Sequence, residues 1–195
     1  MKNANVRDAV AIIELAATLE DGISKGEQWD ELKVAEALKG FRKQQRYFKG
    51  LSFGTISAYG ENGAIIHYKP NNATNKNIGR DSLLLLDSGF RSPQIVVFLL
   101  IGSNITGYII EFSHFKGGQY LDGTTDTTRT FHYGQPTEFE IEAYTRVLMG
   151  AIDLARVTFI KDHGTTDSRL DILARLVVLH LKIFRNRILL PMLLF

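Results

Sequence analysis

Three short segments carry side chains whose type and spacing could bind metal ions or move protons. The segment AIIHYKP contains His67, LLLLDSG contains Asp87, and DGTTD ends in Asp126. Carboxylates that converge from neighbouring strands suit divalent ions, because their oxygens can bridge two metals and offset the metal charge. Two such ions activate a water between them, and a nearby histidine can hydrogen-bond a carbonyl or transfer protons. The chemistry would be metal-assisted cleavage of an amide bond.

Each of these segments also has an ordinary structural explanation. Asp87, within D-S-G, could close a strand in a turn, and Asp122 followed by Gly123 is a common hairpin signal. His67 lies in an alternating apolar run, which predicts a strand, and a lone histidine on a strand is more often a surface or satisfied residue than a catalytic one. Spacing alone therefore leaves both interpretations open for all three segments.

Two helices are expected at the start of the chain. Val6, Val10, Ile13 and Ala17, with Leu15 as a further candidate, recur at helical spacing and predict an amphipathic helix over residues 5–23. A second helix is expected to begin at an N-cap near Asp30. Its inward positions are expected to be Leu32, Ala35, Leu38 and Phe41. Its basic end, Arg42, Lys43 and Arg46, is expected to be a solvated face that meets the helix dipole.

The middle and the end of the chain predict strands followed by further helices. Short β-prone runs at TISAY, AIIHY and DSLLLL, separated by turn sequences, predict three strands. Thr137 and Glu140 have capping-box spacing and predict a long helix. That helix carries Ile141, Tyr144, Leu148 and Ile152 at helical period. A last helix is expected from residue 167 or 168 through residue 176. The fold class is therefore α+β.

Composition excludes several classes of protein. The 195 residues include no cysteine, which rules out a disulfide framework, a thiolate metal site and a cysteine nucleophile. The formal net charge is only +2, and the basic residues are spread along the chain, so nucleic acid is not expected as a partner. The longest apolar run, Ile95 to Ile101, is far shorter than the roughly 20 residues of a membrane-spanning helix. We expect no membrane span and a cytoplasmic location.

Several long segments together closely resemble the Xaa-Pro aminopeptidases. They are GLSFGTISAYGENGAIIHYKP, LLLLDSG, QYLDGTTDTTRTFHYGQPTEFE, YTRVLMGAIDLARVTF and GTTDSRLDILARL. That family shares the creatinase/methionine aminopeptidase fold, known as the pita-bread fold. The resemblance extends from Asn3 to Leu176 except for residues 90–117. It implies the first half of a pita-bread fold and hydrolysis, by a metal-activated water, of the bond before a penultimate proline.

The resemblance also implies roles for individual residues. Asp87 and Asp126 match metal ligands, and His67 matches a histidine of the substrate pocket. Asp122 matches the pattern but is not a ligand. The family site holds two divalent ions, usually manganese and sometimes zinc or cobalt. The implied substrate is a peptide with a penultimate proline.

Two stretches depart from the family pattern. Asp87 and Asp126 are 39 positions apart, and removing the 28 residues of the apolar-rich stretch 90–117 would leave 11, the short connection that the family uses. We therefore expect a partial metallopeptidase catalytic domain over residues 1–176, with an insertion at 90–117, and a hydrophobic tail outside the family pattern over residues 177–195.

The predicted ligand set is incomplete. The family continues into a Gly-His-Gly segment and two glutamates that complete the metal shell, and these do not follow Arg175. We therefore expect no complete catalytic set, no firm hold on two ions and no activity from the chain alone. Two alternatives remain open. One is a non-catalytic fragment that binds or regulates a full-length family enzyme as a homo- or hetero-dimer. The other is a non-functional product of splicing or of a mistaken gene model, with both departing stretches as translated non-coding sequence.

Overall fold

The computed structural model describes residues 1–51, 53–89, 94–101, 104–111, 119–157 and 173. The helices in this part of the chain are α1 (Lys2–Ser24), α2 (Glu31–Gln44), α3 (Glu138–Ala155) and the 3-10 helix η1 (Gly60–Ala64). The strands are β1 (Trp29–Asp30), β2 (Phe48–Gly50), β3 (Ile56–Tyr59), β4 (Asn77–Ile78), β5 (Leu83–Gly89), β6 (Gln94–Ile101), β7 (Asn104–Glu111), β8 (Gln119–Tyr120), β9 (Gly123–Thr124) and β10 (Asp126–His132). The predicted α+β class is confirmed. The helix expected from residue 167 or 168 to residue 176 and the tail at 177–195 lie outside the described residues, apart from Leu173.

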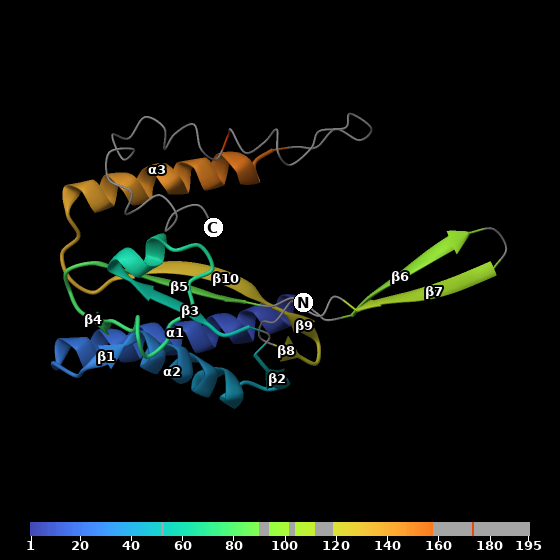
Figure 1. Cartoon of the computed structure of the whole chain (residues 1–195), viewed down its shortest axis with the longest axis horizontal. Helices are drawn as coiled ribbons and strands as arrows, with labels where there is room; N and C mark the ends of the chain where they lie inside the picture. The colour runs from blue at the N-terminus through green and yellow to red at the C-terminus, as the bar shows by residue number, and fades with distance from the viewer. Residues whose placement is uncertain (52, 90–93, 102–103, 112–118, 158–172, 174–195) are drawn as a thin grey trace.

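A three-stranded antiparallel sheet with the order β10-β5-β3 forms the centre of the molecule. Its middle strand β5 carries four consecutive leucines, and such a continuous apolar run suits a strand that is buried on both faces. Leu84 and Leu86 join the core formed with α1 and α2, whereas Leu83 and Leu85 pack with Ala143 of α3. Figure 1 shows the resulting three layers, with α1 and α2 on one side of the sheet and α3 on the other.

Helix α1 forms where it was expected, but it buries a different face. Of the spaced residues only Leu15 is buried, and the other buried side chains include Asp8 and Leu19. Val10 is exposed, and Val6 and Ile13 are still more exposed, at 58% and 66%. The apolar spacing therefore identified the helix correctly but did not identify its inner face.

Helix α2 begins at the predicted cap, because the backbone N–H of Lys33 donates to Asp30 Oδ1 at 2.8 Å. Leu38 is fully buried, as expected. The prediction of a solvated basic end is wrong for Arg42, which has no exposed surface. Its guanidinium pairs with the buried carboxylate of Asp8, so a partner on another helix compensates for the loss of water.

The expected strand at AIIHY is also wrong. The chain forms η1 and then a turn, in which the backbone N–H of Tyr68 donates to the Ile65 carbonyl at 3.1 Å. Ile65 and Ile66 are 53% and 60% exposed. The β-prone composition of the run suggested a strand, but both isoleucines lie largely at the surface. The predicted strands at TISAY and DSLLLL correspond to β3 and β5.

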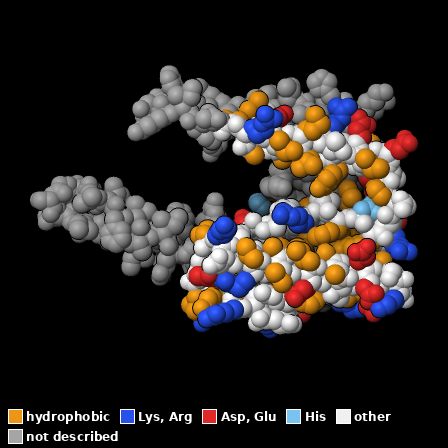
Figure 2. Space-filling model, turned by 180° about the vertical axis from the view of Figure 1, so that it is seen from behind, with side chains coloured by type: hydrophobic (Ala, Val, Ile, Leu, Met, Phe, Trp, Pro, Cys, Tyr) orange, Lys and Arg blue, Asp and Glu red, His pale blue; other side chains and the backbone are white. Residues whose placement is uncertain are grey.

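Helix α3 has the predicted capping box. The backbone N–H of Glu140 donates to Thr137 Oγ1, and the Thr137 N–H donates back to Glu140 Oε2. The apolar residues at helical period lie on its exposed side, away from the sheet: Ile141, Tyr144, Leu148 and Ile152. Figure 2 shows apolar side chains at the surface of this upper layer.

Strands β6 and β7 form a separate antiparallel hairpin within residues 90–117, pairing from Gln94↔Glu111 to Ile101↔Asn104. Figure 1 shows the hairpin extending from the end of β5. Strands β5 and β10 nevertheless pair directly, with Asp126 opposite Gly89. Among the described helices, none has the length and apolar character needed to cross a bilayer.

Candidate metal site

The register of β5 and β10 brings Asp87 and Asp126 close together. Thr128 lies opposite Asp87, and Asp126 lies opposite Gly89. Because side chains two positions apart on a strand share a face, Asp87 and Asp126 are diagonal neighbours on one face of the sheet. Such neighbours are about 7–8 Å apart, a spacing that side-chain oxygens can close around metal ions.

Asp87 is half-buried and its charge is disfavoured. Burial raises the pKa of the Asp87 carboxyl, and the negative charge of Asp126 raises it further. A hydrogen bond from Thr128 Oγ1 to Asp87 Oδ1, at 2.9 Å, and the nearby His67 act in the opposite direction. Two neighbouring carboxylates that are partly shielded from water repel each other, and a bound cation would offset their charge.

Asp122 is separated from this pair by its own contacts. It forms an ion pair with Arg7 of α1, and its hydrogen bond with Arg7 lowers the pKa of the Asp122 carboxyl. It also lies in the two-residue connection between β8 and β9, where Tyr120 pairs with Gly123. The hairpin reading of Asp122–Gly123 is therefore confirmed.

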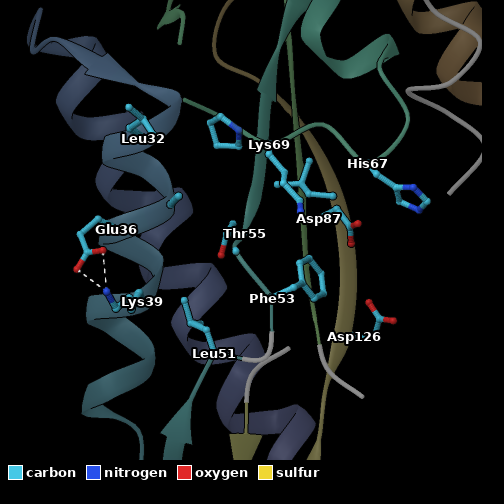
Figure 3. A pocket seen from close by; sticks show the side chains of 14 residues that line it. Leu32, Glu36, Lys39, Leu51, Phe53, Thr55, His67, Lys69, Asp87 and Asp126 are labelled. Atoms are coloured by element: carbon cyan, nitrogen blue, oxygen red, sulfur yellow. Dashed lines mark hydrogen bonds and ion pairs between the residues drawn. The ribbon is translucent and has the colours of Figure 1, made fainter. Parts of the chain in front are cut away.

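His67 reaches the same cavity from the turn after η1. Its φ of 55° is in the left-handed region, which few residues other than glycine adopt and where histidine is among the more frequent exceptions. A strained residue of this kind persists only where its surroundings hold it. Figure 3 shows the side chains of His67, Asp87 and Asp126 on the same side of the pocket.

A buried glutamate anchors the loop that carries His67. Glu31 has no exposed surface, and its carboxylate accepts from the Tyr59 N–H at 2.7 Å, the Tyr68 hydroxyl at 2.7 Å and the Asn62 amide at 2.9 Å. Tyr68 follows His67 directly, so the start of α2 is connected to the histidine turn. Sequence reasoning missed Glu31. Its only local signal was its place directly after the Asp30 cap.

The three predicted residues line one cavity of about 1190 Å³. The walls combine α2, the segment around β3 and the His67 turn. Apolar side chains make up much of the lining: Leu32, Ala35, Leu51, Phe53, Ile56 and Pro70. Glu36 and Lys39, which pair with each other at 3.0 Å, and Lys69 are its other charged residues. The cavity therefore has an apolar wall beside two carboxylates and a histidine.

The donors fit hard or borderline divalent ions, since both carboxylates offer oxygen ligands. Within the described ranges, no group of three or more His, Cys, Asp or Glu side chains is gathered so that it could hold a metal ion. A metal site built on Asp87 and Asp126 would therefore need further ligands from outside the described residues.

Comparison with known proteins places the chain in a family. Residues 1–96 match the model of metallopeptidase family M24. The chain is 41% identical over 157 residues to Xaa-Pro aminopeptidase ApepP of Drosophila melanogaster, covering 80% of this chain and 21% of that protein. It is 44% identical over 162 residues to Xaa-Pro aminopeptidase 1 of Dictyostelium discoideum, covering 82% and 21%.

A solved structure is similar over nearly the whole chain. The X-prolyl aminopeptidase of Caenorhabditis elegans, described as a cytosolic enzyme with a di-nuclear active site, aligns with a TM-score of 0.72 and 33% identity. The alignment covers 93% of this chain and 25% of that one. This chain belongs to metallopeptidase family M24.

Membership of M24 confirms the expected family and the pita-bread type of fold. The chain spans about a fifth of the length of the curated M24 relatives that it matches. The Caenorhabditis elegans enzyme, whose alignment covers most of this chain, is described as having a di-nuclear active site. The ligand roles of Asp87 and Asp126 and the substrate role of His67 stay predictions.

Proposed function

We propose that this chain contributes to an Xaa-Pro aminopeptidase site, in which Asp87 and Asp126 hold divalent metal ions and His67 contacts the substrate. The main support is that three residues from β5, β10 and the η1 turn line one cavity. Bound ions would supply an activated water for attack on the peptide bond. The relatives named Xaa-Pro aminopeptidase and the di-nuclear site of the Caenorhabditis elegans enzyme support the same proposal.

The chain's own residues account for orientation and selectivity in this proposal. Phe53, Ile56 and Pro70 form an apolar wall that suits a proline ring. His67, which lines the same cavity, would hydrogen-bond the carbonyl of the bond to be cleaved. Asp87 would bind a cation in its charged form, which offsets the cost of its burial.

The proposal also extends to the metal, the cellular location and the activity of the isolated chain. We expect manganese as the metal, with zinc or cobalt as substitutes, and a cytoplasmic location like that of the Caenorhabditis elegans enzyme. Two carboxylates leave most coordination positions of two ions to other donors, so we expect no hydrolysis by the isolated chain.

The test uses two peptides, Gly-Pro-Leu and Gly-Ala-Leu, titrated into the purified chain with manganese present. The proposal predicts tighter binding of the proline peptide, by about fivefold or more, because one buried ring is worth roughly 1 kcal/mol or more. His67→Ala should weaken binding of the peptide. Equal affinity for both peptides would contradict the assignment, and release of free glycine would show that the isolated chain is active.

Association with a full-length family enzyme is a second candidate function. It is favoured by the exposed apolar side of α3, where Ile141, Tyr144, Leu148 and Ile152 are 44–53% exposed. Capture of a full-length M24 enzyme by the immobilised chain, reduced by Leu148→Gln, would support it. Capture that is unchanged by this substitution would count against the α3 surface.

A further inference from the structure

The residue after Asp87 points away from the cavity into the core. Successive side chains alternate along a strand, so Ser88 lies on the face of β5 covered by α1 and α2, where it is only 2% exposed. Arg42 Nη1 donates to Ser88 Oγ, and Thr55 Oγ1 lies 3.0 Å from the same oxygen. These hydrogen bonds therefore fix the end of β5, directly beside Asp87, on the face of the sheet covered by α1 and α2.

Arg42 is held in turn by Asp8. Its Nε and Nη2 donate to the two Asp8 carboxylate oxygens at 2.8 Å each, and both side chains are buried. Two parallel hydrogen bonds fix a guanidinium and a carboxylate in one orientation. Through this pair, α1 and α2 are joined to each other and to Ser88.

The same ion pair contacts the segment that leads to Asp126. The Tyr120 hydroxyl of β8 donates to Asp8 Oδ1 at 3.0 Å. Strand β8 forms the hairpin with β9 that immediately precedes Asp126. Helix α1 contacts this hairpin too, because Arg7 forms an ion pair with Asp122. The segments that carry Asp87 and Asp126 are therefore both hydrogen-bonded to the buried Asp8–Arg42 pair, through Ser88 and Tyr120 respectively.

We propose that the Asp8–Arg42 ion pair is a positioning device for the metal site. It holds Ser88 on one side and Tyr120 on the other, and so sets the direction and separation of the Asp87 and Asp126 carboxylates. Neither Asp8 nor Arg42 lines the cavity, so both act through other residues. The inference rests on the proposed function, in which the two aspartates bind metal.

A role in stability alone would not need this arrangement. Well-packed apolar side chains can replace a buried ion pair without loss of stability, because removing two charges from water is costly. Apolar side chains could not direct hydrogen bonds to Ser88 and Tyr120. The contacts to these two residues are what distinguish positioning from simple packing.

The test compares two substitutions in α2. Arg42→Lys keeps the positive charge but loses the paired hydrogen bonds of the guanidinium, whereas Val34→Ala removes buried apolar volume. Tyr120→Phe serves as a milder variant that removes a single hydroxyl. Three quantities are measured on each full chain: the urea midpoint, the manganese Kd, and hydrogen exchange of residues 86–88 and 119–126 without metal.

We expect Arg42→Lys to raise the manganese Kd by about 10- to 100-fold, as loss of outer-shell support commonly does. Exchange should increase at both segments, and Tyr120→Phe should increase it at residues 119–126 alone. Val34→Ala should lower the urea midpoint without a comparable change in Kd or in local exchange. Equal effects of Val34→Ala and Arg42→Lys would overturn the inference.

The two proposals can fail separately. If the unmodified chain binds no manganese, the proposed function fails, and exchange in the metal-free chain still decides whether the ion pair positions the two segments. Unchanged exchange at residues 86–88 and 119–126 in Arg42→Lys would refute positioning even if metal binds.

Discussion

The charged form of Asp87 destabilises the folded chain when no metal is bound. Its pKa is raised in the folded chain, chiefly by burial. A group whose pKa is raised on folding contributes stability that is complete below its unfolded pKa, about 3.9, and is lost as the pH rises through the folded pKa. At neutral pH the charged carboxylate therefore opposes folding unless a cation is bound.

Asp87→Asn should consequently raise the melting temperature of the chain in EDTA at pH 7. The difference from the unmodified chain should shrink as the pH falls through the raised pKa of Asp87, because the carboxyl then becomes protonated and neutral. Added manganese should stabilise the unmodified chain and not the variant. A variant that melts below the unmodified chain in EDTA at pH 7 would contradict this account.

Glu31 makes the opposite contribution, because its buried carboxylate satisfies several donors. Glu31→Ala would leave the Tyr59 N–H, the Asn62 amide and the Tyr68 hydroxyl without this acceptor. We expect a loss of about 2–4 kcal/mol in the free energy of unfolding, measured with urea. Glu36→Ala, an exposed position on the same helix, should change it by less than about 0.5 kcal/mol.

The sequence allowed prediction of the residues that face the cavity but not of those that support them. His67, Asp87 and Asp126 stood in recognisable segments. Asp8 and Arg42 are 34 positions apart, and Arg42 and Ser88 are 46 apart, so no local pattern connects them. A buried ion pair across two helices looks, in sequence, like two ordinary surface charges.

At the scale of elements, capping residues were the most informative signals. Asp30 begins α2 and the Thr137–Glu140 box begins α3, because side-chain oxygens there satisfy helix N–H groups that lack an intrahelical partner. Apolar spacing was less reliable. It suggested a strand at AIIHY and the wrong inner face for α1, since an exposed isoleucine and a buried one are indistinguishable in sequence.

Thr137→Ala should remove one half of the α3 capping box. We expect a loss of about 1 kcal/mol in the free energy of unfolding, together with faster hydrogen exchange over the first turn of α3. Thr145→Ala is the matched control. It lies within the same helix, where its hydroxyl donates back to the Ile141 carbonyl, and its substitution should be close to neutral. Equal losses from both variants would show that the cap is not the cause.

At the scale of the whole molecule, the arrangement of the site does not depend on chain continuity between its two aspartates. Strands β5 and β10 pair from Leu83↔His132 to Gly89↔Asp126, although the β6–β7 hairpin lies between them in sequence. The sequence anticipated this adjacency, because only 11 positions would separate Asp87 from Asp126 without residues 90–117.

Deleting residues 90–117, which joins Gly89 to Gly118, should therefore preserve the β5–β10 pairing and the manganese affinity. The entropy of closing a shorter loop is slightly less unfavourable, by about 1 kcal/mol, so stability should be unchanged or a little higher. Hydrogen-exchange protection of β5 and β10 would check the pairing. Loss of that protection would show that the hairpin is part of the fold.

The most direct test of the account is manganese binding measured by calorimetry on three chains: unmodified, Asp126→Asn and Asp122→Asn. Because the described residues supply only two ligands, the account predicts weak but measurable binding by the unmodified chain. It also predicts affinity at least tenfold weaker in Asp126→Asn, as expected for loss of a ligand, and little change in Asp122→Asn. Asp122 is the matched control because it lies four positions away and pairs with Arg7. No binding by the unmodified chain, or equal binding by all three, would contradict the metal site.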